Sequence, residues 1–102
     1  MPYLIDTVIP AENALRRDAI RPEHLAYLDA NARIVRAAGA KLTETGAVGL
    51  GSFYLIDVES REEAERFIAG DPYAAAGLIT SMTLTRVRAG FFNYGRNMPA
   101  AS

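Results

Sequence analysis

Residues 50–70 read LGSFYLIDVESREEAERFIAG, a strongly apolar segment followed directly by an amphipathic one. The segment Leu50–Val58 predicts a β-strand, because it is a short and strongly apolar run. Ser60 and Glu63 have the spacing of a capping box, in which each side chain bonds the backbone N–H of the other residue. We therefore expect a helix that begins after Ser60 and ends at Gly70, since glycine commonly terminates helices.

The flanking segments predict the remaining elements of one domain. Upstream we expect a strand at Tyr3–Ile9, a loop or loose helical turn at 11–20, a helix from Pro22 to about Ala38 that stops at Gly39, a weak strand at Lys41–Thr45 and a turn at Gly46. Downstream, alternation predicts a last strand at Leu78–Arg88. The order strand–helix–strand–strand–helix–strand is that of the ferredoxin-like βαββαβ fold, an α+β fold with a four-stranded antiparallel sheet and two helices on one face.

The central strand is apolar on both of its faces. The run Phe53-Tyr54-Leu55-Ile56 has no polar position to turn toward solvent, so the sheet face away from the helices also needs cover. A second copy of a chain this short is the simplest cover. We therefore predict a homodimer whose sheets pack face to face.

Composition excludes several classes of protein. The 102 residues fit one domain, which we expect over residues 1–90 with a C-terminal tail at 91–102. Eleven basic and twelve acidic residues give a net charge of -1, which argues against a nucleic-acid partner. Cysteine is absent, and neither a leader nor a membrane span is indicated, so we expect a cytoplasmic protein with no membrane partner. One histidine and scattered carboxylates do not have the spacing of a metal site, and no metal or cofactor is expected.

The single histidine, His24, is the natural candidate for proton transfer near neutral pH. At about 100° per residue, it shares the inward stripe of the predicted helix with Leu28 and Val35. If the helix begins near Pro22, His24 lies close to the positive end of the helix dipole, which favours a neutral imidazole. A nearby carboxylate would instead fix the tautomer of the ring, and Asp71 is the candidate.

Other polar residues are candidates for binding a substrate. Tyr73 could donate a hydrogen bond to a substrate oxygen, and Arg21 could hold a carboxylate or a phenolate. Arg86 shares a strand face with Met82 and either caps the sheet edge or places a cation beside a pocket. Ser52 follows small residues that leave space near the sheet, but it lacks the setting of a serine nucleophile. Each of these side chains also has an ordinary structural explanation, in packing, turns or solvation.

An ordered set of short motifs resembles the YCII-related (YciI-like) family. The matching positions are RxxHLxYL at 21–28, AGA at 38–40, Gly46, Gly49, SxEEA at 60–64, DPY at 71–73 and GL at 77–78. The resemblance runs from Tyr3 to about Arg88, and it is weak over residues 11–20. It implies a dimeric α+β barrel of ferredoxin-like subunits, with an active-site histidine and aspartate that correspond to His24 and Asp71. One relative is a dehydrochlorinase of a chlorinated hydroxyquinol, and the wider superfamily includes muconolactone isomerases and cofactor-free monooxygenases.

Two functions are consistent with these features. The first is a cofactor-independent lyase or isomerase, in which His24 moves a proton on a small aromatic or cyclic oxygenated substrate and Asp71 orients the ring. The second is a dimeric module without catalytic activity, which binds a small molecule or a protein and uses His24 as a structural residue. Substitution of His24 separates them, because it changes turnover in the first case and stability in the second.

Overall fold

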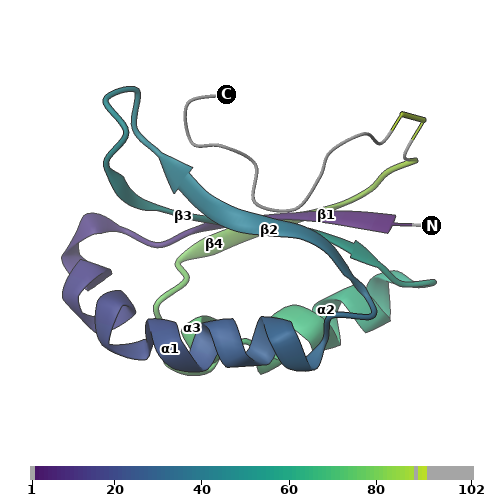
Figure 1. Ribbon diagram of the computed structural model, residues 1–102, viewed down its shortest axis with the longest axis horizontal. Coiled ribbons are helices and arrows are strands. Elements are labelled where there is room, and N and C mark those ends of the chain that lie inside the picture. The colour runs from purple at the N-terminus through teal and green to yellow at the C-terminus, as the bar shows by residue number, and fades with distance from the viewer. Residues whose placement is uncertain (1, 89, 92–102) are drawn as a thin grey trace.

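The computed structural model describes residues 2–88, 90 and 91. Along the chain lie β1 (Pro2–Val8), the 3-10 helix η1 (Ala11–Asn13), α1 (Ala14–Ala30), β2 (Val35–Leu42), β3 (Val48–Asp57), α2 (Arg61–Gly70), α3 (Pro72–Ala75) and β4 (Ser81–Arg86). Figure 1 shows the helices together on one side of the sheet.

The sheet has four strands in the order β2-β3-β1-β4. Every neighbouring pair is antiparallel, with β1 between β3 and β4 in the middle of the sheet. This topology confirms the predicted ferredoxin-like fold. Between α2 and β4 lies one short element that was not predicted, the helix α3, which begins at the Asp71-Pro72 step.

Strict alternation along β1 separates the two faces of the sheet. Tyr3, Ile5 and Thr7 are buried beneath the helices, whereas the residues between them are exposed on the other face. The same inward face of β3 contributes Tyr54 and Ile56, both fully buried. Apart from Thr7, these side chains form the main core together with the apolar face of α2.

The prediction for the first helix is wrong at both ends. Helix α1 begins at Ala14, eight residues before Pro22, and ends at Ala30, so residues 35–38 belong to β2. Pro22 lies inside the helix, where it removes one backbone donor and leaves the carbonyl of Asp18 without its helical partner. Both residues are exposed, so water can satisfy that carbonyl.

The alanine-rich segment after α1 is a strand for tertiary reasons. Its composition favours a helix, but pairing with β3 decides its conformation, since tertiary contacts routinely override propensity. Gly39 shows how close that pairing is, because a Cβ atom there would lie 2.9 Å from the ring of Phe53. Val35 therefore does not share a helical stripe with His24, as the sequence had suggested.

The second helix is as predicted. Ser60 accepts a hydrogen bond from the backbone N–H of Glu63 at 3.1 Å, and α2 ends at Gly70. The side chain of Glu63 in turn accepts a bond from the backbone N–H of Glu59 at 3.2 Å. The return bond of the predicted capping box thus comes from Glu59 instead of Ser60, and the Ser60 cap secures the first turn of a helix that buries Phe67 and Ile68 in the core.

Replacing Ser60 with alanine is expected to lower the free energy of unfolding by about 1 kcal/mol, the usual cost of losing an N-cap oxygen. Urea denaturation measures this loss. Ser60→Asp retains an acceptor at the same place and should keep stability near that of the wild type. Equal losses in the two variants would mean that the cap oxygen is not the stabilising group.

The sheet face away from the helices carries apolar side chains that are partly exposed. Leu4, Val8 and Phe53 each expose between 37% and 39% of their surface. The predicted homodimer would cover this face, and it remains a prediction for a single chain. The expected tail at 91–102 lies outside the described residues, apart from Phe91.

Candidate active site

Asp71 is the fixed centre of a buried polar cluster beneath the sheet. It follows the last turn of α2, caps α3 and is fully buried. Its carboxylate accepts hydrogen bonds from the backbone N–H of Tyr73 at 2.8 Å and from the hydroxyl of Tyr54 at 2.8 Å. Because a buried carboxylate is stable only when its oxygens are hydrogen-bonded, these contacts fix its position.

His24 provides the third partner of Asp71. Its Nδ1 atom lies 2.8 Å from one carboxylate oxygen and 3.0 Å from the other. A carboxylate only accepts, so Nδ1 carries the proton, and in the neutral ring Nε2 is left as an acceptor. Nε2 has no hydrogen bond to any described residue, yet it is not sealed from solvent.

Two tyrosines hold the imidazole ring in place. The ring of Tyr73 stacks on His24 with a centroid separation of 4.1 Å and an angle of 14° between the planes. Tyr54 meets the imidazole edge-on at 6.1 Å. His24 is therefore fixed by a hydrogen bond at one nitrogen and by aromatic contacts on its ring, while its other nitrogen stays available.

The phenols of the cluster are held in their neutral form. Burial, and after it the negative charge of Asp71, raises the pKa of Tyr54 well above its ordinary value. Burial also raises the pKa of Tyr73, against the opposing field of Arg17 and Arg21. Neutral phenols can donate hydrogen bonds at physiological pH, as Tyr54 does to Asp71.

A cavity of about 410 Å³ lies beside His24, between α1 and the strands β2 and β3. It is lined by Arg17, Asp18, Arg21, His24, Leu25 and Leu28 of α1, by Ala38, Gly39 and Ala40 of β2, by Val48, Gly51 and Ser52 of β3, and by Tyr73. Its volume is in the range of small-molecule sites. Gly51 has φ +123, and a Cβ atom there would collide with the carbonyl oxygen of Thr7, so this part of the wall stays without a side chain.

The structure brings most of the predicted site residues together. His24, Arg21, Ser52 and Tyr73 line the cavity, and Asp71 lies behind His24. Arg86 is elsewhere. It pairs with Tyr3 across the sheet. Along β4 it lies four positions, or roughly 13 Å, from Met82, the residue that pairs with Thr7. It is an exposed residue at the end of β4, consistent with its alternative role at the sheet edge.

The observed start of α1 overturns the expectation that the helix dipole favours a neutral His24. His24 lies ten positions after Ala14, the first residue of α1. The field of a helix terminus fades within about one turn, so it does not select the neutral ring here. The hydrogen bond to Asp71, which the sequence could only suggest, fixes the tautomer instead.

Sequence reasoning missed Tyr54 and Arg17 as parts of the site. Tyr54 was detectable, because alternation along β3 places it on the same face as Ser52. Arg17 was hidden by the wrong helix start. Once α1 begins at Ala14, Arg17 is seven residues before His24 and therefore on the same helix face.

Alkaline pH is expected to destabilise the protein through Tyr54. Above about pH 10 the unfolded chain loses its phenolic protons, whereas the folded state keeps that of Tyr54 because its pKa is raised. The folded state then binds more protons, and stability falls as pH rises. In urea denaturation above pH 10, Tyr54→Phe should make this fall shallower by up to about 1.4 kcal/mol per pH unit. An unchanged slope would contradict the assignment to Tyr54.

Residues 2–88, 90 and 91 contain no group of three or more His, Cys, Asp or Glu side chains placed to hold a metal ion. Among the helices of that part of the chain, none is both long and apolar enough to cross a membrane.

Comparison with known proteins adds to this geometry. A family model described as the YCII-related domain matches residues 1–88. The chain belongs to the YCII-related family. The resemblance in the sequence motifs is thereby confirmed, and the family match covers α1, β3 and the Asp71-Pro72-Tyr73 turn that build the cavity.

Among solved structures, this YCII-related protein is similar to 5-chloro-2-hydroxyhydroquinone dehydrochlorinase (TftG) from Burkholderia phenoliruptrix AC1100, in complex with 2,5-dihydroxybenzoquinone. The TM-score is 0.81 and the sequence identity 29%, over 88% of this chain and 96% of the other. A comparison with curated protein sequences gives no match.

Proposed function

We propose that this YCII-related protein is a cofactor-independent lyase or isomerase that acts on a small aromatic or cyclic oxygenated molecule. In this proposal the His24–Asp71 pair transfers the proton. The observation that carries it is the orientation of the imidazole. A fully buried carboxylate holds Nδ1 at 2.8 Å, and Nε2, beside a cavity, makes no hydrogen bond to any described residue.

The proposed step begins with Nε2 as a general base. It takes a proton from a ring carbon, and the electron pair of the broken C–H bond forms a new double bond. In a lyase reaction the neighbouring carbon releases its leaving group with the bonding electrons. In an isomerase reaction the electron pair of an adjacent double bond shifts to the next carbon, which takes the proton back from the imidazolium. Asp71 stabilises the imidazolium in either case, because its carboxylate already bonds Nδ1.

Hydrogen-bond donors in the cavity support the same chemistry. Proton abstraction beside an oxygenated carbon places negative charge on that oxygen, and donors near it lower the barrier. Tyr73 lines the cavity with a raised pKa, so its hydroxyl remains protonated and able to donate. Ser52 of β3 also lines the cavity and carries a second hydroxyl. Both are assigned here as substrate-binding residues.

The similarity to TftG supports this class of reaction. That protein is named a dehydrochlorinase of a chlorinated hydroquinone, and its structure holds a dihydroxyquinone. At 29% identity, the likeness favours a small cyclic substrate and leaves the particular compound open to experiment.

A second candidate, a binding module in which His24 is structural, is favoured by one observation. Asp71 caps α3 and is satisfied by Tyr54 and Tyr73, so the cluster would also stabilise the fold in a protein without catalytic activity. In that case, replacing His24 would change the free energy of unfolding, and the variant would still bind the ligand.

Incubation with a panel of chlorinated hydroxyquinols and unsaturated lactones in deuterated water distinguishes the two. Nuclear magnetic resonance follows both product formation and the exchange of carbon-bound hydrogen for deuterium, which reveals proton transfer even without net turnover. The enzyme proposal expects product formation or exchange with at least one compound, and loss of that signal in His24→Gln. Binding of panel members without exchange or product would favour the module.

A further inference from the structure

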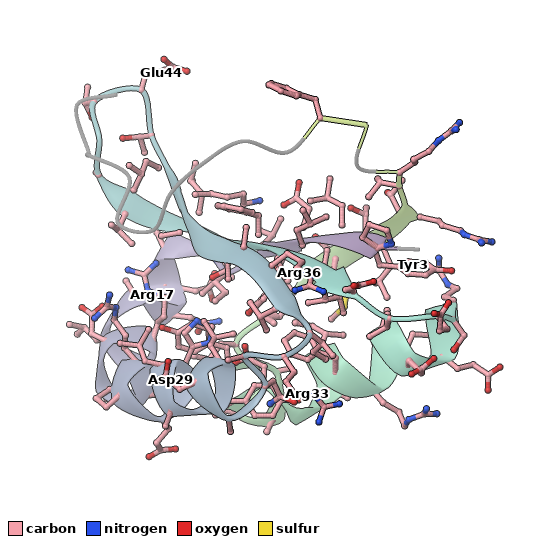
Figure 2. All side chains as sticks on the ribbon, turned by 45° about the vertical axis from the view of Figure 1, so that its right-hand side comes forward. Tyr3, Arg17, Asp29, Arg33, Arg36 and Glu44 are labelled. Atoms are coloured by element: carbon pink, nitrogen blue, oxygen red, sulfur yellow. The ribbon has the colours of Figure 1, made fainter. Side chains whose placement is uncertain are left out.

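Arg17 is a buried cation in the wall of the cavity. Its side chain is only 9% exposed, and it lies on the first turns of α1, between that helix and the strands (Figure 2). Arginine is rarely buried without a partner, because removing a charge from water is costly unless another charge or several hydrogen bonds compensate.

The protein itself compensates this charge weakly. The one ion pair of Arg17 among the described residues is with Asp18, at 3.5 Å between Nη2 and Oδ1. That separation is longer than a good hydrogen bond, and the Asp18 side chain is 65% exposed to water. The guanidinium makes no hydrogen bond to any described residue, although it has five N–H donors.

Arg17 is one of the residues that line the cavity. Every fully buried side-chain nitrogen in the described part of the chain has a hydrogen-bond partner. The nitrogens of Arg17 that lack one are therefore not fully buried, and they belong to a residue that lines the cavity. The positive charge of Arg17 also acts on the phenol of Tyr73, another residue of the cavity wall, and opposes the rise of its pKa. The buried guanidinium thus makes this end of the cavity electropositive.

Arg21 was the cation expected from the sequence, but burial favours Arg17 as the principal anion contact. Arg21 is an exposed residue at the cavity rim, where water weakens the attraction between charges. A contact to Arg17 forms in a setting largely removed from water, where the same charges interact more strongly.

The position of Arg17 relative to His24 defines the length of the ligand. The two residues are seven apart on one face of α1, so their Cα atoms are about 10 Å apart along the helix axis. A small ring held between them can place an oxygen at Arg17 while one of its carbons faces Nε2 of His24.

We propose that Arg17 binds an ionised oxygen of the ligand, so that the cavity selects small cyclic organic anions over their neutral analogues. The planar guanidinium suits such an oxygen, because it offers two parallel donors where an ammonium offers a point charge. This inference rests on the proposed function for its substrate class, but it concerns binding alone and is tested without turnover.

The test compares two quinones that differ in charge. The probe is 2,5-dihydroxybenzoquinone, whose acidic hydroxyls are ionised at neutral pH, and its neutral counterpart is 2,5-dimethoxybenzoquinone. Isothermal titration calorimetry measures the affinity of each for the wild type, Arg17→Met and Arg17→Lys. Arg33→Met is the matched control, since it removes one positive charge from an exposed position far from Arg17 (Figure 2).

The wild type is expected to prefer the anion. Arg17→Met should weaken anion binding by about 10- to 100-fold, the usual effect of losing a charge-assisted hydrogen bond. It should leave the neutral quinone unaffected, and Arg33→Met should change neither. Arg17→Lys keeps the charge and should retain part of the preference, which also tests the proposal if the methionine variant folds poorly.

Three results would overturn the assignment: equal affinity of the wild type for both quinones, no binding of either, or an unchanged anion preference in Arg17→Met. None of them depends on catalysis. An inactive protein that still shows the Arg17-dependent preference would refute the proposed function and retain the anion site.

Discussion

His24→Gln is expected to lower the turnover of the proposed proton-transfer reaction by about 100- to 10,000-fold, the contribution that a positioned general base makes. Glutamine can still donate a hydrogen bond to Asp71 from its amide, so the buried carboxylate keeps a partner. It cannot accept a proton at neutral pH. The variant therefore removes the chemistry of Nε2 while preserving most of the structure around it.

Steady-state kinetics and thermal unfolding on the same preparations measure this effect. The expected pattern is a large loss in kcat with a melting temperature close to that of the wild type. Tyr27→Phe is a suitable control. It removes a partly buried hydrogen bond of the same helix, from the Tyr27 hydroxyl to the carbonyl of Phe67 at 2.7 Å, and Tyr27 does not line the cavity. Unchanged turnover in His24→Gln, or a fall in kcat of the same size in Tyr27→Phe, would rule out His24 as the base.

Asp71→Ala is expected to lower the free energy of unfolding by about 3–5 kcal/mol, the usual cost of removing one partner from a buried polar pair. Three donors lose their acceptor at once, namely Nδ1 of His24, the hydroxyl of Tyr54 and the backbone N–H of Tyr73. Loss of the bond from Tyr73 also removes the N-cap of α3, which the Asp71 side chain provides. The cost is large because the site is fully buried and water cannot replace the carboxylate.

Chemical denaturation gives the change directly. Asp71→Asn keeps an oxygen that can accept a hydrogen bond and should lose less stability than the alanine variant. Asp29→Ala removes an exposed aspartate from the last turn of α1 and should change stability by no more than about 0.5 kcal/mol. A loss below about 1 kcal/mol in Asp71→Ala would show that the buried cluster does not stabilise the fold as its hydrogen bonds imply.

Local sequence signals were sufficient wherever neighbouring residues complete a structural motif by themselves. Ser60 and Glu63 cap α2 through contacts within one turn, and alternation along β1 separates the buried from the exposed residues. The order of these elements then specifies the ferredoxin-like topology, because few antiparallel arrangements accommodate it. His24 and Asp71 could be singled out as chemical groups for the same reason, since the chain has one histidine and one Asp-Pro turn of this kind.

Tertiary structure decided the parts that depend on residues far apart in the chain. The segment 35–38 has the composition of a helix, yet hydrogen bonds to β3 make it a strand. The long α1 contains Pro22, and its true start brings Arg17 onto the face of His24. The hydrogen bond between His24 and Asp71 joins residues 47 positions apart. Local patterns specify which way a side chain faces within its own element, but only the packing of elements determines which side chains meet, because that packing depends on contacts along the whole chain.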